Sequence, residues 1–423
     1  MILATLLAAA TAAAGPVPPP ASPLGARTVR PDRLEVVVLP LEGARTTSLR
    51  VVVRAGSADD PPGKEGLAHL LEHLLLAARG PDGLDLPEAA RAAGARLNAF
   101  TSREVTSYVL DAPAEVFSAL AERLLRAVSA PSLKDVELSR ELEVVAREDQ
   151  YHGEDGTVTQ LVEDALFRGS APEGPIVGNV GSRDRIRLQD VVDFHGRRYV
   201  GAATTVVAAG AISASDLDAL LERAVRLPRG AEGEPVARTG PSPLLPVNDR
   251  IRAPFLAVVL GYALEDEDRD ACAPLAALLE RRLLLELVAP PTGQPALRTV
   301  QVSCLDLRGV STLVALGYTR TLDAPDLPES MQRVFDDVAR RPATAAERAA
   351  ADLRLARQWD RVVADPAALA DDVTFRAARR SAAGTSLPES SHGAFRADVV
   401  RRVAGRAFRE ARRFFILFSP LEG

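Results

Sequence analysis

The chain has 423 residues, more than one compact core usually holds, so we expect two or more domains. Hydrophobic residues make up 47% and charged residues 26% of the sequence, which excludes disordered, collagen-like and multi-span membrane proteins. The net charge is −6, from 51 basic and 57 acidic residues without a basic block, so the sequence predicts no nucleic-acid partner.

The N-terminal residues predict export. Residues 1–15 form an apolar stretch ending in small residues, typical of a signal peptide, although no Lys or Arg precedes it. An uncleaved anchor or a misassigned start is the alternative. Residues 16–30 are rich in Pro and are expected to form a stiff spacer. No later segment has 18 uninterrupted apolar residues, so the mature chain is expected to lack a membrane span and to be periplasmic or secreted.

Strands and helices are predicted in two successive sets. The first set, in a domain spanning 31–227, has strands at 32–40, 48–57, 95–102, 106–113 and 203–211, and helices at 66–79, 86–94, 114–129, 134–150, through 191–200 and at 213–225. Residues 228–248 have the densest Pro and Gly of the interior and are expected to be a linker.

The second set, in a domain spanning 249–423, repeats this order of elements. It has a strand at 253–264, a helix at 270–287, strands at 298–307 and 311–319, a long helical run and a final strand at 412–420. The repetition suggests an internal duplication. We therefore predict an α+β fold of two homologous halves, each an antiparallel-rich sheet with helices on one face.

The sequence His-Leu-Leu-Glu-His at residues 69–73 predicts a metal site. On a helix, His69 and His73 stand one turn apart on one face, so both imidazoles can reach one metal ion. Glu72 lies on the same side and could take a proton from a water attacking a carbonyl carbon. This is the H-x-x-E-H form of the zincin motif. The structural alternative is a pair of histidines tied into an apolar core.

A catalytic zinc needs a third protein ligand from another element. The helix at 134–150 places Glu137, Glu141 and Glu148 along one face, which taken alone is more typical of a solvated helix surface. His152 and His195, near helix ends, are expected to be structural rather than ligands. The cysteines Cys272 and Cys304 are too few for a thiolate zinc site, and the sequence leaves their pairing open.

The first domain resembles the pitrilysin family of metallopeptidases. The resemblance rests on GLAHLLEHLLL, LNAFTSREVTSYVLDAP, ELEVVARE and GPIVGN with VVDFHGRRYV, in order and spacing over residues 32–225. It implies that Glu148, 75 residues after His73, is the third ligand of one Zn²⁺ per chain, and that Glu141 supports the ligands from outside. It also implies that the strand carrying Asn98 and Phe100 binds an extended peptide. The alternative for Asn98 is a structural role, as an Asn in a turn or at the end of a strand.

The second domain lacks the zinc motif and departs from the family pattern. Many active relatives have a Gly-rich turn with Ser-Ser-Arg-Leu there, followed by an Arg and a Tyr that hold the substrate near the zinc. Here Arg282 matches the Arg of the turn, but the later Arg and the Tyr have no convincing counterparts. We consider that Arg281, Arg282, Arg298 or Tyr318 supplies this clamp from a shifted position, or that a partner subunit does.

We therefore expect a zinc-dependent endopeptidase of clamshell shape that hydrolyses unfolded peptides or small proteins. Glu72 is the expected general base, and His69, His73 and Glu148 are the expected zinc ligands. The alternative is a weakly active or inactive pitrilysin-like subunit that assembles with a homologous partner or as a homodimer. A purely structural zinc site is disfavoured, because such sites usually fill all four positions with Cys and His.

Overall fold

The computed structural model describes residues 24–80, 82–155, 175–231, 233, 247–251, 256–307, 310–319, 326–378, 385–387, 395–409 and 413–420. Residues 1–15, most of the expected spacer and linker, and His392 lie outside these ranges. The spacer prediction was wrong at its end, because Ala26–Val29 forms a strand, β1, that pairs with Glu35–Pro40 (β2). The linker prediction likewise extended too far, since Val247 and Asn248 begin a strand.

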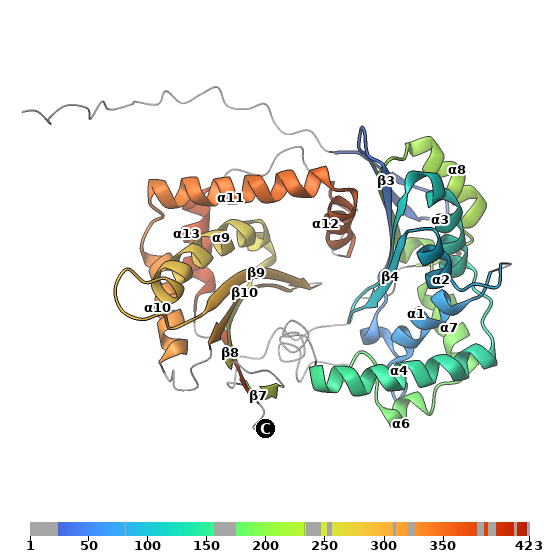
Figure 1. The fold of residues 1–423 in the computed structure, drawn as a ribbon, viewed down its shortest axis with the longest axis horizontal. Helices are drawn as coiled ribbons and strands as arrows, with labels where there is room; N and C mark the ends of the chain where they lie inside the picture. The colour runs from blue at the N-terminus through green and yellow to red at the C-terminus, as the bar shows by residue number, and fades with distance from the viewer. Residues whose placement is uncertain are drawn as a thin grey trace, which may run out of the picture.

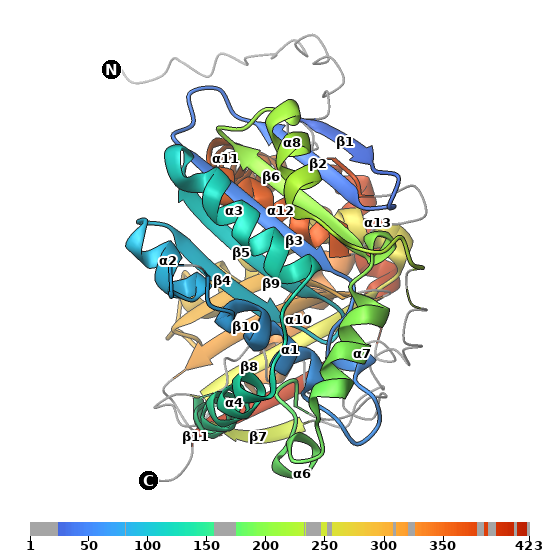
Figure 2. The same ribbon diagram turned by 90° about the vertical axis from the view of Figure 1, so that its right-hand side faces the viewer.

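The first half, residues 24–231, contains a six-stranded sheet with helices on one face (Figures 1 and 2). Its other elements are the strands Thr46–Val53 (β3), Arg96–Thr101 (β4), Thr106–Pro113 (β5) and Thr204–Gly210 (β6), and the helices Leu67–Ala77 (α1), Leu86–Ala92 (α2), Ala114–Ser129 (α3), Asp135–Asp155 (α4), Val180–Arg183 (α6), Leu188–Arg198 (α7) and Ala214–Ala224 (α8). Every second residue of its strands points into the core beneath the helices, as Val36 and Val38 of β2 and Leu49, Val51 and Val53 of β3 do, because successive side chains of a strand point to opposite faces.

The second half, residues 247–420, contains a five-stranded sheet. Its elements are the strands Val247–Ile251 (β7), Leu256–Leu264 (β8), Thr299–Leu307 (β9), Val310–Thr319 (β10) and Arg413–Pro420 (β11), and the helices Cys272–Leu283 (α9), Leu327–Arg340 (α10), Ala345–Ala364 (α11), Pro366–Ala378 (α12) and Ala397–Ala407 (α13). The core of this half lies between the sheet and α9, α10 and α13.

The two sheets have the same topology, as the repeated order of elements predicted. Leaving out β1, the first sheet runs β2-β6-β3-β5-β4 and the second runs β7-β11-β8-β10-β9. In both, the strands follow the order first, fifth, second, fourth, third. In both, the first and fifth strands are parallel and all other neighbours are antiparallel. The predicted fold class of two homologous α+β halves is therefore confirmed.

Helix α12 belongs to the second half by sequence but packs on the first sheet. It contacts β3 and β6 on the face opposite α1 and α3, where Leu369, Ala370 and Val373 meet Val37 and Val207 in a small apolar cluster (Figure 1). The predicted picture of helices on only one face of each sheet therefore holds for the first half's own helices, while α12 covers part of the second face.

Buried charges accompany this apolar contact. Arg50 on β3 is fully buried and donates to Asp111 on β5 and to Asp371 on α12, at 2.7 Å in each case. Glu35 on β2 accepts the backbone N–H of Thr385 at 2.8 Å. A buried charge left without partners costs several kcal/mol, roughly 3–5, so the bond from Arg50 to Asp371 holds α12 on the sheet, and that from Thr385 to Glu35 holds the segment after α12 there.

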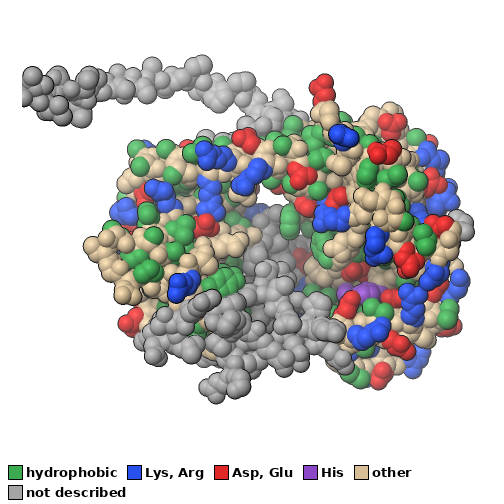
Figure 3. Space-filling model, in the orientation of Figure 1, with side chains coloured by type: hydrophobic (Ala, Val, Ile, Leu, Met, Phe, Trp, Pro, Cys, Tyr) green, Lys and Arg blue, Asp and Glu red, His purple; other side chains and the backbone are tan. Residues whose placement is uncertain are grey.

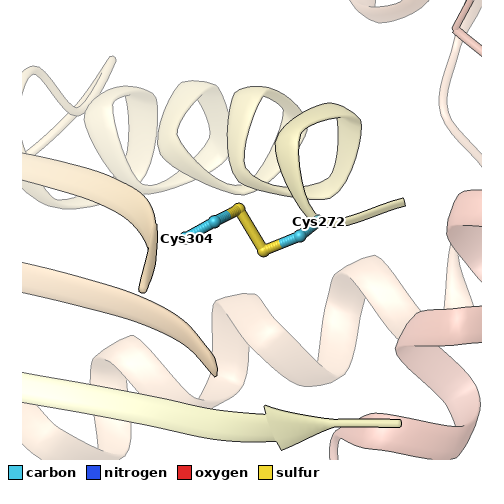
Figure 4. Close-up of a disulfide and its surroundings, with 2 residues drawn as sticks. All are labelled: Cys272 and Cys304. Atoms are coloured by element: carbon cyan, nitrogen blue, oxygen red, sulfur yellow. A yellow bond between two sulfur atoms is a disulfide. The ribbon is translucent and has the colours of Figure 1, made fainter. Parts of the chain in front are cut away.

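Cys272 and Cys304 form a disulfide in the second half (Figure 4). The bond joins the first residue of α9 to β9, with 6.0 Å between the two Cα atoms. The pairing that the sequence left open is thus present. No helix within the described ranges is long and apolar enough to cross a membrane.

Candidate metal centre

Helix α1 carries the H-x-x-E-H sequence, and its start is fixed by two residues before it. Gly66, the N-cap, has φ 98°, and a Cβ there would lie 2.6 Å from the carbonyl oxygen of Val177. A side chain is therefore excluded at Gly66 by both conformation and space. The buried carboxyl group of Asp60 accepts the N–H of Gly66 at 2.7 Å and that of Ala68 at 2.8 Å. These contacts satisfy N–H groups that the first helical turn leaves without a partner.

The leucines of α1 face the core, and the two histidines lie at its margin. Leu67, Leu70, Leu71, Leu74 and Leu75 are buried, while the side chains of His69 and His73 are 13% and 16% exposed. The imidazole centroids are 4.7 Å apart. Ligand atoms of His69, Glu72 and His73 lie within 4.8 Å of one another. The helix thus gathers two imidazoles and a carboxylate at one point, as the spacing predicted.

Helix α4 brings two further carboxylates to the same point. Glu148 Oε2 lies 3.3 Å from His73 Nε2 and 3.7 Å from His69 Nε2. Glu141 is two turns earlier on α4, and its Oε2 lies 3.5 Å from His73 Nδ1. The ring of His73 therefore lies between two carboxylates, one at each nitrogen. Figure 3 shows histidine side chains beside acidic ones on the half of the molecule that carries α1.

The pKa values of two groups report this crowding of negative charge. Burial lowers the pKa of His73, but its hydrogen bonds to Glu141 and Glu148 outweigh burial and raise the pKa to about 10. Burial also raises the pKa of Glu72 to about 7, although the Thr101 hydroxyl and the neighbouring His73 act in the opposite direction. In this cluster Glu72 and His73 therefore hold their protons more tightly than the same groups do in water.

The donor set fits a divalent zinc ion. Two imidazole Nε2 atoms and one Glu148 oxygen converge, which is the N₂O set of a catalytic zinc with an open fourth position. Glu141 faces the Nδ1 of His73, where a carboxylate typically fixes the tautomer of a ligating histidine. A bound cation would replace the proton that His73 otherwise holds on Nε2, facing Glu148, while Nδ1 keeps its proton toward Glu141. The chemistry of the site therefore suits a metal.

Thr101 is a site residue that the residue-by-residue prediction missed. Its hydroxyl donates to Glu72 Oε2 at 2.5 Å. It is the last residue of β4 and stands opposite Thr106 on β5. In the sequence, Thr101 stands three residues after Asn98, the residue expected to bind the peptide. Because side chains alternate along a strand, the two point to opposite faces of the sheet, so the expectation for Asn98 did not extend to Thr101.

Asn98 and Phe100 lie on β4, on the face away from α1. Both are exposed, and Phe100 is unusually so for a large apolar side chain, at 45%. Strand β4 is the last strand of its sheet, so among the described residues its outer edge has no pairing strand. The expected peptide-binding residues thus lie at a free sheet edge, close in sequence to Thr101 but not in contact with the imidazoles.

Arg282, one of the four residues considered for a substrate clamp, bonds to acidic residues within the second half. Its side chain is buried on α9, where it donates to Glu347 at 2.9 Å and to Asp337 at 3.0 Å. Arg282 thus ties α9 to α10 and α11 within the second half. Of the other candidates, Arg298 is exposed just before β9, and Tyr318 is half-buried on β10, on the sheet face opposite the core residues Leu313 and Ala315.

The remaining described histidine side chain is structural, as expected. His195 Nε2 lies 2.9 Å from the carbonyl oxygen of Val128, and its ring stacks on Tyr199. Burial lowers the pKa of His195, and the hydrogen bond to Val128 opposes that effect. His152 lies in the last turn of α4, and its side chain is outside the described part of the structure.

Comparison with known proteins identifies the family of the first half. Residues 36–179 match the profile of the family described as Insulinase (Peptidase family M16). An uncharacterised zinc protease of Mycobacterium leprae is 33% identical over 220 residues, which cover 49% of this chain and 48% of that protein. The matched region thus spans about half the length of this relative, and the same holds for a related zinc protease of Mycobacterium tuberculosis.

Solved structures extend the likeness to both halves. The crystal structure of a protease from Helicobacter pylori matches 94% of this chain and 100% of its own, with a TM-score of 0.78 at 18% identity. An inactive peptidase domain from Pseudomonas fluorescens matches 94% of this chain and 99% of its own, with a TM-score of 0.74 at 17% identity. At these identities the likeness shows the fold alone. Residues 36–179 of this chain therefore match the insulinase and pitrilysin family of peptidases, as the sequence predicted.

Proposed function

We propose that this chain is a zinc-dependent endopeptidase that cleaves unfolded peptides or small proteins. The observation that supports this most directly is the convergence of His69, His73 and Glu148 around one point, with Glu72 beside them. We assign those three residues as the ligands of one zinc ion per chain and Glu72 as the general base. Zinc at this site would polarise the scissile carbonyl and lower the pKa of the attacking water.

The protein side chains then have distinct tasks. Glu72 takes a proton from the water as it attacks and returns it to the leaving amine. Glu141 holds the ring of His73 through Nδ1, so that Nε2 keeps its orientation. A carboxylate that accepts the proton must lie close to the ligands without being one, and the contact of Glu72 with Thr101 is consistent with that position.

The free edge of β4 is the proposed peptide-binding surface. An extended chain can pair with the backbone of an edge strand whatever its sequence, and this suits an enzyme that acts on unfolded substrates. Asn98 and Phe100 face outward from this strand and would contact alternate side chains of the peptide. Strand addition also explains why the substrate must be unfolded.

We also propose that the protein works outside the cytoplasm. The apolar residues 1–15 have the composition of a signal peptide, and the Cys272–Cys304 disulfide is of the kind that persists in an oxidising compartment. The domains proposed from the sequence then comprise a signal peptide, a Pro-rich spacer, a zinc-bearing half, a linker and a second half without a zinc motif.

A second candidate function is that of a zinc-bearing subunit that needs a partner. The clamp Arg and Tyr of relatives have no convincing counterparts in this sequence, and Arg282, one of the residues considered in their place, is held within the second half by Glu347 and Asp337. Loss of one oxyanion donor costs about a hundredfold or more in rate, so a lone chain without a clamp would be a weak enzyme. Either a homologous partner or a homodimer would supply the missing group. Sedimentation and activity of the purified chain alone separate this candidate from a self-sufficient enzyme.

The proposed function is tested with the zinc-loaded full chain and a quenched fluorescent peptide. We expect cleavage that a chelator abolishes and added zinc restores. Glu72→Gln should retain one zinc per chain and lose on the order of a hundredfold or more in turnover, as for a missing general base. Cleavage by Glu72→Gln at the wild-type rate would refute the assignment of Glu72.

A further inference from the structure

The base Glu72 is held by one hydrogen bond from outside its own helix. The carboxyl group is buried, with 6% of the residue exposed, and its Oε2 accepts the hydroxyl of Thr101 at 2.5 Å. We propose that Thr101 is a positioning residue for Glu72, which fixes Oε2 so that the other oxygen is left to exchange the proton. This inference rests on the proposed function, in which Glu72 is the general base.

The hydroxyl of Thr101 has little choice of acceptor. Its neighbour Thr106 donates its single hydrogen to the carbonyl oxygen of Ala55 at 3.0 Å, and a carbonyl can only accept. Thr106 therefore offers no hydrogen to Thr101, whose Oγ1 lies 3.5 Å away. The one hydrogen of Thr101 has a far closer acceptor in Glu72. The donor direction is thus set by the surrounding partners.

Two buried tyrosines hold Thr106 in turn. The hydroxyls of Tyr108 and Tyr199 lie 2.8 Å apart, and Tyr199 is hydrogen-bonded to Thr106. Burial raises the pKa of both tyrosines, so both stay neutral and keep their hydrogens. The hydroxyls of Tyr108, Tyr199 and Thr106 thus form one buried cluster, in which Thr106 is also bonded to the carbonyl of Ala55. It anchors the residue beside Thr101 without competing for Glu72.

The hairpin between β4 and β5 sets the position of Thr101. Thr101 and Thr106 are opposite residues in the antiparallel register, and the Ser102 hydroxyl accepts the N–H groups of Glu104 and Val105 in the turn between them. A shift of one residue would turn Thr101 away from Glu72. The same strand thus has Phe100 on one face and the support of the base on the other, so a peptide added to β4 would lie along the element that positions Glu72.

The activity test compares Thr101→Val, which removes the donor at nearly constant shape, with Thr101→Ser, which keeps it. A hydrogen bond to a charged group corresponds to about tenfold to hundredfold in rate, so we expect Thr101→Val to lose that much in kcat. KM should stay within about threefold and zinc content at one per chain, because neither the sheet edge nor the ligands change. Thr101→Ser should retain most of the wild-type kcat.

Thr204→Val is the matched control. Thr204 is also a threonine of the first sheet, fully buried where Thr101 is half-buried, and its hydroxyl donates to the carbonyl oxygen of Val200 at 2.8 Å. We expect its kcat to stay near the wild-type value. Equal losses of kcat in Thr204→Val and Thr101→Val would overturn the inference, since the effect would then be structural. A wild-type kcat in Thr101→Val would overturn it as well.

A second readout does not depend on activity. In zinc-free protein, Thr101→Val should lower the urea midpoint of unfolding in the wild-type background and change it little in a Glu72→Ala background. The same shift in both backgrounds would overturn the contact. If the zinc-loaded wild type cleaves no peptide, the proposed function fails, and the unfolding cycle alone decides whether Thr101 holds Glu72. If the wild type cleaves and Thr101→Val keeps its kcat, the inference fails alone.

Discussion

Glu141 Oε2 lies 3.5 Å from His73 Nδ1, on the opposite side of the ring from Glu148. A carboxylate at Nδ1 fixes the tautomer of an imidazole, orients its plane and leaves Nε2 available for a metal. Glu141 is itself buried, so the contact is shielded from solvent.

We therefore predict that Glu141→Ala lowers zinc affinity by roughly tenfold to hundredfold, the usual effect of losing such a support. Competition with a chromophoric chelator measures this affinity. Glu143→Ala on the exposed side of the same helix is the control and should bind zinc like the wild type. Unchanged affinity in Glu141→Ala would show that His73 is oriented without this carboxylate.

A second prediction concerns the contact between α12 and the first sheet. Arg50 and Arg96 both bind Asp111, but the Arg50 side chain is fully buried and that of Arg96 is 62% exposed. We expect Arg50→Ala to lower the free energy of unfolding by roughly 3–5 kcal/mol, because it leaves Asp111 without its buried partner and removes the bond to Asp371. Arg96→Ala should cost less than about 1 kcal/mol. Urea unfolding measures both values, and equal effects would contradict this description of the contact.

A third prediction uses the pH dependence of Glu347, the partner of Arg282. Burial raises the pKa of this carboxyl, but hydrogen bonds from Arg282 and Thr344 outweigh burial and lower the pKa to about 2. Because the folded-state pKa is depressed, the stabilisation is present above the unfolded pKa near 4.5 and is lost as pH falls toward 2. Glu347→Gln should therefore be less stable than the wild type at pH 7, by on the order of 2–3 kcal/mol.

The difference between Glu347→Gln and the wild type should shrink steadily below pH 4.5 in urea unfolding measured from pH 7 to pH 3. Glu329→Gln, which changes an exposed carboxylate of α10, should show no such trend. A difference that does not depend on pH would mean that the ion pair with Arg282 contributes no charge-dependent stability.

A fourth prediction concerns the disulfide and export. The Cys272–Cys304 bond closes a loop with a sequence separation of 32 residues. In the chain-entropy description, a loop of this length corresponds to about 3–4 kcal/mol of stability. Reductant should lower the free energy of unfolding of the wild type, measured with urea, by about that amount and leave that of a Cys272→Ser, Cys304→Ser double variant unchanged. Protein isolated from its host should contain no free thiol and should begin near residues 14–25, and reduced cysteines behind an intact Met1 would argue against export.

Much of the fold followed from local patterns in the sequence. Val-rich runs bounded by turn residues marked the strands, and the helix of His69 and His73 followed from its helix-forming composition and the glycine that follows it. The common strand order of the two sheets followed from the repeated sequence of elements. The strands and the helix of His69 and His73 are each indicated by neighbouring residues, so no knowledge of distant partners was needed for them.

Other features depend on partners far away in the sequence. Arg50 in a valine-rich strand gives no local sign that Asp371, 321 residues later, will pair with it, so the docking of α12 was not predicted. Arg282 was considered for a substrate clamp from its place in the sequence, yet its bonds to Glu347 and Asp337 make it part of the second half's interior. The role of Thr101 depends on the register of a hairpin, which sequence patterns define only within a residue or two.

The central claim is that His69, His73 and Glu148 hold one zinc ion while Glu72 stays outside its ligand set. Anomalous diffraction at the zinc edge, from crystals of the zinc-loaded full chain, tests this most directly. We predict a single zinc peak bonded to Nε2 of both histidines and to the Glu148 carboxylate, with one position left for water and Glu72 still bonded to Thr101. A zinc peak bonded to the Glu72 carboxylate in place of Glu148, or no zinc between the two histidines, would contradict the account.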